Sequence, residues 1–439
     1  TISSGGRNPS IKALASAPSG IVIYDRNGQP AMRLEGYHYY YGAHTDAPDV
    51  LDSFGYAQDK PFGYAQDKPL THARRPCRTE DVGRHAALID ALPHLHYTTA
   101  SGMVADRPAQ IADRVSLAQC LIHSTKPVLA MPVTPQALAD CHEMAALAAG
   151  GTDTLRERPR MIVYAEPVSP LVHPDTSLEK LMYCAAHGIP VVYTPYAAMG
   201  GTAPLSPAAI TAQLCAESLS GLVVHQLKAP GAPFIFGGMA SVMDMKTTIF
   251  SYGAPEFQRG NTLMAEMAHY FELPNFGTAG TSDAQCFDGQ ALIEATSSCM
   301  MAALTGANLV HDVGLLGNAT VVMPEMIVAT DEIIAMVRHM LGDVPTDDAA
   351  LALDVIGTVG AGGEFVTHAH TLEHFRDVWY PDLFYRGGDK AWSETDQEAF
   401  ETRVNARTRE LMRTHAAALL PDETIQAIQA VIRRAEAAL

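Results

Sequence analysis

The stretch NFGTAGTSDAQCFDGQ, residues 275–290, joins a short apolar run to a helix-like segment. It begins with small turn-forming residues and continues with a dense series of hydrogen-bonding side chains. A strand, a polar loop and a helix in this order are typical of one βα unit, whose strand end is a common place for function. Units of the same kind occur on both sides of this stretch, so the pattern indicates the architecture of the chain.

From residue 76 onward, short β-like runs alternate with helix-like segments. Segments such as PAQIADRVSLAQCLIHS (108–124) carry apolar residues at helical spacing. Seven alternations predict a parallel sheet, and an eighth strand expected near DVIGTVGAGG (354–363) predicts a closed (β/α)₈ TIM barrel. The first βα turn lacks GxGxxG, which weighs against an open dinucleotide-binding sheet. The seven runs are 95–101, 126–133, 160–170, 189–200, 233–241, 274–280 and 308–314.

Three regions are expected around this pattern. Residues 1–75 form an N-terminal extension, 76–390 the barrel, and 391–439 a segment of charged, polar helices. Within the extension, GIVIYDRNGQPAMRLEGYHYYYG predicts a hairpin with its turn at Asn27-Gly28. The tandem octamer FGYAQDKPFGYAQDKP, residues 54–69, is too short to be a solenoid repeat and is interpreted as an expanded surface loop. The C-terminal helices pack outside the barrel or in an oligomer contact, and we expect a homo-oligomer.

Composition limits the class of partner and the compartment. The net charge of −18 repels nucleic acid and anionic membranes. No apolar run reaches the roughly 18 residues of a membrane span, so none is expected. The seven cysteines are odd in number and form no CxxC, which favours a reducing, cytoplasmic location. The chain starts without Met and without a basic-then-apolar leader, so no export signal is expected.

Several β-like runs end in small or polar residues, and in a barrel those ends converge on one face. Glu166 lies at the end of an apolar run, where a buried charge is costly unless it is paired or functional. His311 and Asp312 are either a structural pair or part of a site. Ser282 and Asp283 either belong to the site or cap the following helix.

Aromatic residues gather near the strand ends as well. Tyr97, Tyr164, Tyr193, Tyr196 and Phe236 lie in or next to predicted strands. Aromatic faces beside a carboxylate suit a quaternary ammonium group, which offers no N–H donor and is bound by cation–π attraction. Tyrosines in strands are more often barrel-core residues, so this pattern alone does not identify a site.

A metal site is the natural rival interpretation. THAHTLEH, residues 367–374, places His368, His370 and His374 close together, with the last two on one helical face. Because HExxH and clustered cysteines are absent, no bound metal is expected. These histidines are expected instead to form hydrogen bonds within a fold-closing loop.

Long ordered motifs give the chain a recognisable resemblance. FGGMASVMDMKTTIFSYGAPEF (236–257), FGTAGTSDAQCFDGQA (276–291), GANLVHDVG (306–314), GGEFVTHAHTLEHFR (362–376) and Trp392 follow one another, with VIYDRNGQP, RRPCRTED and EPVSPL upstream. The chain resembles the trimethylamine methyltransferase (MttB-like) superfamily from about residue 18 onward. Members usually have a longer N-terminal segment, and the tandem octamer departs from their pattern.

The resemblance implies a (β/α)₈ barrel that demethylates an amine and passes the methyl group to the cob(I)alamin of a separate corrinoid protein. Archaeal founders carry pyrrolysine just after "SD", where this chain has Gln285, or Cys286 if the register shifts by one. Without that electrophile, the resemblance implies a substrate that is already quaternary, such as glycine betaine or a similar betaine. The implied catalytic residues are Gln285, Asp283 and Glu166, and the implied substrate-binding residues are Tyr97, Tyr196, Phe236, Ser282, His311 and His370.

Two other functions stay open at this point. One is a metal-dependent barrel enzyme that uses the histidines of residues 367–374. The other is a non-catalytic protein that binds or senses a betaine with the same fold. Neither composition nor the pocket residues distinguishes the sensor from the enzyme.

Overall fold

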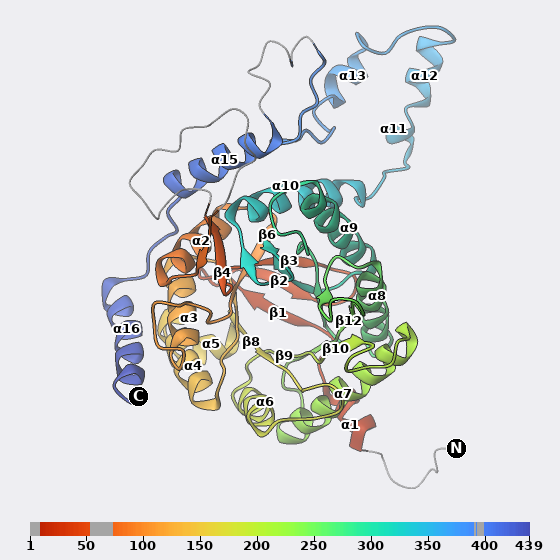
Figure 1. The fold of residues 1–439 in the computed structure, drawn as a ribbon. Coiled ribbons are helices and arrows are strands. Elements are labelled where there is room, and N and C mark those ends of the chain that lie inside the picture. Colours follow the sequence, from red (N-terminus) through yellow and green to blue (C-terminus); the bar gives the residue numbers. More distant parts are fainter. Residues whose placement is uncertain (1–8, 53–72, 390–391, 393–398) are drawn as a thin grey trace, which may run out of the picture.

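Eight parallel strands close into a barrel in the computed structural model, which describes residues 9–52, 73–389, 392 and 399–439 (Figure 1). Every one of the seven predicted runs supplies a strand, so the predicted (β/α)₈ class is confirmed. The tandem octamer lies outside the described residues. The barrel strands are β3 (Tyr40–His44), β6 (Leu95–Ala100), β7 (Val128–Ala130), β8 (Met161–Ala165), β9 (Val191–Tyr193), β11 (Phe234–Gly237), β14 (Asn275–Thr278) and β15 (Leu309–Val313).

The eighth barrel strand is not where the sequence predicts it. Residues 353–359 form a helix, α12 (Leu353–Val359), and the missing strand is β3. The barrel therefore begins at residue 40, inside the segment that we assigned to the extension. β3 pairs in parallel with β15 on one side and β6 on the other, with Tyr40 opposite Leu309. This pairing joins the first barrel strand in the chain to the last, which closes the cylinder.

The N-terminal hairpin plugs one end of the barrel. β1 (Ile21–Tyr24) and β2 (Pro30–Leu34) pair antiparallel, and Gly28 has a φ of +73° in the turn, as the sequence predicts. The apolar side chains of the hairpin pack with inward-facing residues of the barrel strands in one core cluster. Asn308, which precedes β15, donates from Nδ2 to the carbonyl oxygens of Gly36 at 3.0 Å and His38 at 2.7 Å. The plug thus covers the amino ends of the strands and leaves the carboxyl ends for a site.

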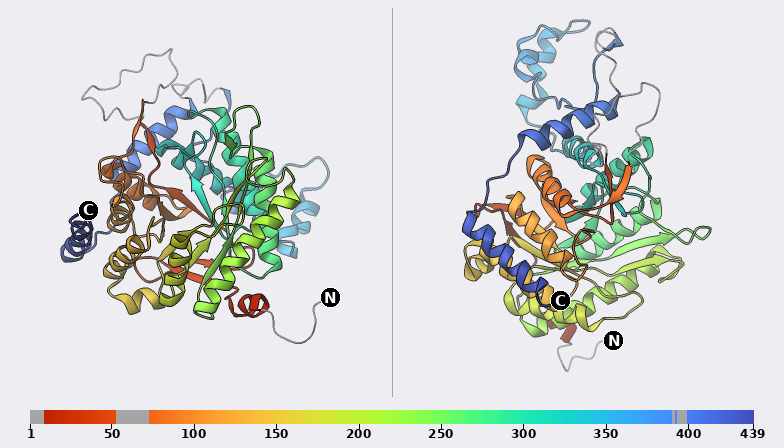
Figure 2. Two further views of the ribbon diagram at one scale, coloured as in Figure 1. Left: turned by 60° about the horizontal axis from the view of Figure 1, so that its bottom comes forward. Right: turned by 60° about the vertical axis from the view of Figure 1, so that its left-hand side comes forward.

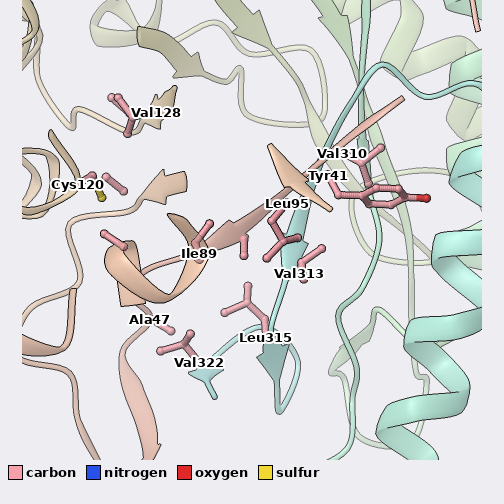
Figure 3. Packing of buried hydrophobic residues seen from close by; sticks show 14 of the residues in the cluster. Tyr41, Ala47, Ile89, Leu95, Cys120, Val128, Val310, Val313, Leu315 and Val322 are labelled. Carbon is pink, nitrogen blue, oxygen red and sulfur yellow. The ribbon is translucent and has the colours of Figure 1, made fainter. Parts of the chain in front are cut away.

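Helices surround the barrel, and the larger core lies between them and the outer faces of the strands (Figure 2). Figure 3 shows part of it, with Tyr41, Leu95, Val310 and Val313 packed beside one another. The helices up to residue 340 are α1 (Pro9–Ser16), α2 (Thr79–Ala91), α3 (Ala112–His123), α4 (Pro135–Ala149), α5 (Thr152–Glu157), α6 (Asp175–His187), α7 (Pro207–Lys228), α8 (Pro255–Tyr270), α9 (Gly289–Thr305) and α10 (Pro324–Met340).

Helix α7 is long and apolar enough to cross a membrane by length and composition, the one such helix among the described residues. It contacts α1, α6 and α8 and the barrel strands β9 and β11. Its buried face carries Glu217, Ser218 and His225. These contacts are those of a helix in the outer ring of the barrel, and its apolar composition is weak support for a span.

The strand-to-helix loops at the carboxyl ends build two small sheets. One joins β10 (Tyr196–Met199), β12 (Met239–Met243) and β13 (Phe250–Ser251); the other joins β16 (Leu315–Leu316), β17 (Val321–Val322), β4 (Asp49–Asp52) and β5 (Ala73–Pro76).

The C-terminal part is helical, as predicted, and lies outside the ring (Figures 1 and 2). Helix α15 (Phe400–Thr414) contacts α10 and α2, and the last helix, α16 (Asp422–Glu436), contacts α4 and α3. In the chain between α10 and these helices, three short helices of the described residues project as an arm away from the ring (Figure 1). The arm consists of α11 (Asp348–Leu351), α12 and α13 (Ala369–His374).

Candidate active site

The barrel interior ends in a polar and aromatic layer at the carboxyl ends of the strands. Because side chains alternate along a strand, apolar residues such as Leu309 fill the barrel below this layer, and His311 follows two positions later on the same face. His44 ends β3, and Glu166 comes directly after β8. The Phe276 ring contacts two members of the layer, with its centroid 4.2 Å from that of His311 and 5.8 Å from that of Tyr164.

Two histidines converge on one carboxylate in this layer. Oδ1 of Asp312 is 2.9 Å from His44 Nε2 and 3.2 Å from His311 Nε2, and all three residues are buried. The other ring nitrogens have fixed partners: His44 Nδ1 is 2.9 Å from Ser101 Oγ, and His311 Nδ1 is 2.9 Å from the carbonyl oxygen of Gly277. Burial lowers the pKa of His311, which favours its neutral form.

Asp312 is held in an unusual state. Its φ is +80°, a left-handed conformation that a non-glycine residue adopts only when its surroundings impose it. Its Oδ2 is buried without a hydrogen-bond partner, and so is the hydroxyl of Tyr97. Burial and then the Asp312 charge raise the pKa of Tyr97, so the phenol stays protonated. Unpaired buried polar atoms beside strained backbone are typical of a ligand site.

Glu166 is the acidic group on the open side of this layer. Its Oε2 accepts a hydrogen bond of 2.8 Å from the hydroxyl of Tyr164. Its side chain is exposed to solvent, but the surrounding protein removes it from bulk water enough to raise its pKa. Burial also raises the pKa of Tyr252, with further contributions from the charges of Asp312 and Glu166. The charges of the carboxylates therefore raise the pKa values of tyrosine hydroxyls in this layer.

The polar loop at 275–290 mainly ties neighbouring loops together. Asp283 accepts hydrogen bonds from the hydroxyl of Ser251, from the backbone N–H groups of Tyr252 at 2.8 Å and Gly253 at 3.0 Å, and from Asn318 Nδ2 at 2.9 Å. Three loops at the carboxyl ends thus meet at this carboxylate. Its contacts fit a residue that positions the Tyr252 segment.

Ser282 faces away from the barrel interior. Its hydroxyl donates to Glu294 Oε2 on α9 at 2.5 Å, and its backbone N–H donates to the carbonyl oxygen of Leu315 at 3.0 Å. The helix cap is a different residue, Asp288, whose Oδ1 accepts from the backbone N–H of Gln290 at 2.9 Å. Ser282 therefore anchors the loop against α9.

The remaining candidate residues are scattered. Gln285 is exposed, and its Nε2 donates to the carbonyl oxygen of Asp283 at 3.1 Å. Tyr196 lies on β10, with its ring 5.2 Å from that of Phe250. Phe236 points out of the barrel and packs against Phe271 in the outer core, since its neighbour Ile235 takes the inward position.

His370 is not brought to the barrel layer. It lies on α13 of the projecting arm, where its ring centroid is 4.4 Å from that of His374 (Figure 1). His374 Nδ1 is 2.7 Å from Asp377, so this cluster has local partners. The expected hydrogen bonding of these histidines is present, but on an arm outside the ring.

The candidate sets omit His44 and Asp312, which the structure places at the centre of the layer. A signal for His44 was present in the sequence: YYYGAHTD, residues 39–46, is an aromatic run that ends in small and then polar residues, like the other barrel strands. Because the run directly follows the predicted hairpin turn and strand, the local pattern indicates a hairpin strand rather than a barrel strand. Asp312 stands beside His311 in the sequence, where either a structural pair or part of a site is predicted.

Comparison with known proteins gives a consistent family match. The family model described as trimethylamine methyltransferase (MTTB) matches residues 6–439. The glycine betaine methyltransferase of Desulfitobacterium hafniense strain Y51 is 28% identical over 425 residues, which are 95% of this chain and 84% of the relative. The trimethylamine methyltransferase MttB of D. hafniense strain DSM 10664 / DCB-2 is 30% identical over 294 residues, which are 67% of this chain and 59% of the relative.

Among solved structures, the monomethylamine methyltransferase MtmB of Methanosarcina barkeri aligns over 98% of this chain and 79% of its own. The identity is 10% and the TM-score is 0.46.

Proposed function

Because this chain belongs to the trimethylamine methyltransferase family, we propose that it removes a methyl group from a quaternary amine of the glycine betaine class and transfers it to the cob(I)alamin of a partner corrinoid protein. The family membership supports methyl transfer as the reaction. The observation that supports a cationic substrate is the exposed carboxylate of Glu166 beside Tyr164, in the aromatic layer at the carboxyl ends of the barrel strands.

The layer has the chemistry that a quaternary ammonium group needs. Such a group has no N–H to donate, so it is held by aromatic faces and by nearby negative charge. Tyr164 and Phe276 supply ring faces, and Glu166 supplies an exposed carboxylate beside them. Binding should be moderate, since the positive charge on nitrogen disappears as the methyl group leaves and tight binding of that charge would slow the reaction.

Gln285 supports the choice of a substrate that is already quaternary. By the family resemblance it stands where the archaeal members have pyrrolysine, with Cys286 as the alternative, and neither a glutamine amide nor a thiol offers an electrophile to activate a tertiary amine. A quaternary amine needs no such activation, because it departs as a neutral tertiary amine. We propose that Gln285, Asp283 and Glu166 bind and orient the substrate, with Asp283 acting through the Tyr252 segment.

The corrinoid of the partner protein would supply the nucleophile that accepts the methyl group. The side of the barrel from which it would approach exposes large apolar side chains in the loops that follow β6, β7 and β8. Exposed apolar patches are typical of protein contacts, and this rim lies beside Glu166. We assign the rim to the corrinoid protein. Its exposed residues are Met103, Val133, Val168, Leu171 and Val172.

The location and assembly follow as parts of the same proposal. All seven cysteines are free, and six of them are buried, which fits a reducing cytoplasm. The arm exposes apolar side chains such as Val366, Leu372 and Phe375, which an adjacent copy in a homo-oligomer would cover. We therefore propose a cytoplasmic homo-oligomer.

A substrate panel tests the function. The purified protein is mixed with cob(I)alamin, free or on a corrinoid protein, and with glycine betaine, other betaines, tetramethylammonium or trimethylamine. The spectrum of the methylated corrinoid is then followed. A betaine should give the fastest transfer, and trimethylamine the slowest. Faster turnover of trimethylamine than of every quaternary amine would overturn the substrate assignment, and tight betaine binding without transfer to any corrinoid would favour a sensor.

A further inference from the structure

We propose that His44, His311 and Asp312 bind a divalent transition-metal ion at the carboxyl ends of β3 and β15. Of the described residues, these three form the group of His, Cys, Asp or Glu side chains whose ligand atoms all lie within 4.8 Å of one another. All three are buried. Two imidazoles and one carboxylate are a ligand set that first-row metals use, with further positions left open for water or substrate.

In both histidines, a hydrogen bond of Nδ1 orients the ring so that Nε2 faces Asp312. A carbonyl oxygen only accepts, so His311 Nδ1, 2.9 Å from the Gly277 carbonyl, must carry a proton. The opposite ring nitrogen, Nε2, lies 3.2 Å from Asp312 Oδ1, so both atoms are close enough to bind one ion. An Nδ1–H bonded to a backbone carbonyl is the usual outer partner of a metal-bound histidine.

His44 is arranged in the same way. Its Nδ1 lies 2.9 Å from the hydroxyl of Ser101, which can accept from it. Its Nε2 is buried and makes no well-directed hydrogen bond, although Asp312 Oδ1 is only 2.9 Å away. The short distance without hydrogen-bond alignment is expected when both atoms point to a common position beside the line that joins them. That position is where the ion would lie.

Asp312 supplies two further observations. Its second oxygen, Oδ2, is buried without a partner, which leaves a carboxylate lone pair for an ion. The backbone at Asp312 has a φ of +80°, so the chain adopts a strained conformation where its side chain meets both histidines. A purely structural carboxylate would be expected to have both oxygens satisfied, as Asp283 does with its four donors.

The ion would complement the aromatic and acidic layer around it. A betaine carries a carboxylate as well as a cationic nitrogen. An open coordination position would accept a carboxylate oxygen, leaving the nitrogen to Tyr164 and Glu166. This role in substrate binding rests on the proposed function, whereas the metal site itself does not. The proposal differs from the expectation, drawn from the absence of HExxH and of clustered cysteines, that no metal is bound.

Metal binding is tested without amine or corrinoid. The full chain is stripped with a chelator, reloaded with Zn²⁺ or Co²⁺, freed of excess ion, and its metal content is measured by mass spectrometry. The wild-type protein should hold about one ion per chain, and the cobalt form should show visible ligand-field bands. Asp312→Asn and His44→Ala should hold almost none. Ser101→Ala, which removes only the outer partner of His44, should weaken affinity about 10- to 100-fold.

His374→Ala is the matched control, since it removes a histidine of the arm and should leave one ion bound. Circular dichroism of the metal-free proteins shows whether each variant folds. If the ligand variants do not fold, a rise in the unfolding temperature of the wild type with Zn²⁺ but not with Mg²⁺ still supports the site. Less than about a tenth of an ion in the reloaded wild type, or full occupancy in folded His44→Ala, would overturn it. A loaded protein that transfers no methyl group would contradict the proposed function alone.

Discussion

His44 on the first barrel strand and Asp312 on the last lie with Nε2 and Oδ1 2.9 Å apart. They are 268 positions apart in the chain (312 − 44), and only the pairing of β3 with β15 makes them neighbours. His311 reaches the same carboxylate at 3.2 Å. The centre of the candidate site is therefore formed at the seam where the barrel closes.

Changing Glu166 to Gln should lower methyl transfer at least 10-fold with little loss of stability. The carboxylate is exposed and accepts one hydrogen bond, from Tyr164, which a glutamine oxygen can also accept. The variant loses the negative charge beside the substrate cation. A tenfold lower rate corresponds to about 1.4 kcal/mol of activation free energy. Transfer kinetics and urea unfolding of both proteins check this. In the wild type, the KM for a cationic substrate should also rise as pH falls through the raised pKa of Glu166, and the variant should lack that rise.

Changing Tyr97 to Phe should leave the free energy of unfolding unchanged or higher, because the hydroxyl is buried without a partner. If a ligand supplies the missing partner, its affinity should fall about 2- to 10-fold, the effect of one hydrogen bond of roughly 0.5–1.5 kcal/mol. Tyr41→Phe is the control. Its hydroxyl donates to the Cys299 carbonyl at 2.7 Å outside the barrel, so its loss should destabilise the fold without changing affinity. A stability loss in Tyr97→Phe equal to that of the control would contradict the role.

Changing Asp283 to Asn should reduce stability and transfer together. An asparagine NH₂ would face groups that already donate, including Ser251 and the backbone of Gly253, at a cost of about 1–3 kcal/mol. The Tyr252 segment would shift with it. Asp244→Asn is a matched control, because Asp244 also accepts from backbone N–H groups, but in the exposed turn before β13. Thermal unfolding and transfer rates distinguish the outcomes, and lost transfer at unchanged stability would make Asp283 a direct participant in the chemistry.

Changing Asp331 to Asn should flatten the pH dependence of stability between about pH 4 and 7. Burial raises the pKa of Asp331 from 3.8 to about 7, so in this window the folded chain keeps a proton that the unfolded chain releases. This contribution stabilises the fold fully below the unfolded pKa and is lost as pH rises through 7. At about 1.4 kcal/mol per pKa unit, the difference between 3.8 and 7 amounts to about 4 kcal/mol. Asn keeps the acceptor for the backbone N–H of His94. Parallel pH profiles of urea unfolding for the two proteins would contradict the assignment.

The sequence pattern predicts where the strands lie, but near a strand end it does not predict which side chains face the inside of the barrel. The runs at 233–241 and 308–314 are apolar and bounded by turns, and they form β11 and β15 as predicted. Near a strand end, however, a shift of one residue changes the face. Phe236 packs outward against Phe271 while Ile235 fills the barrel, because neighbouring side chains in a strand point to opposite sides.

The local sequence pattern also gave a wrong prediction for the first barrel strand and for the position of the arm. YYGAH, residues 40–44, carries a glycine because a Cβ at Gly42 would come within 2.3 Å of the Tyr97 ring, a contact made only when β3 pairs with β6. His370 belongs to a polar motif like those at the strand ends, but the chain leaves the ring after α10 and carries it outward (Figure 1).

The sequence by itself determined the repeating strand and helix units and the gathering of polar residues at the strand ends, because both follow from local periodicity and from the cost of burying unpaired charge. Tertiary structure alone decided which of those residues meet. Closure of the barrel brought His44 to Asp312, the loops at the strand ends packed around Asp283, and the chain carries His370 outward on the arm after α10. Contacts between distant strands depend on how the ends of the sheet join, and no local pattern carries that information.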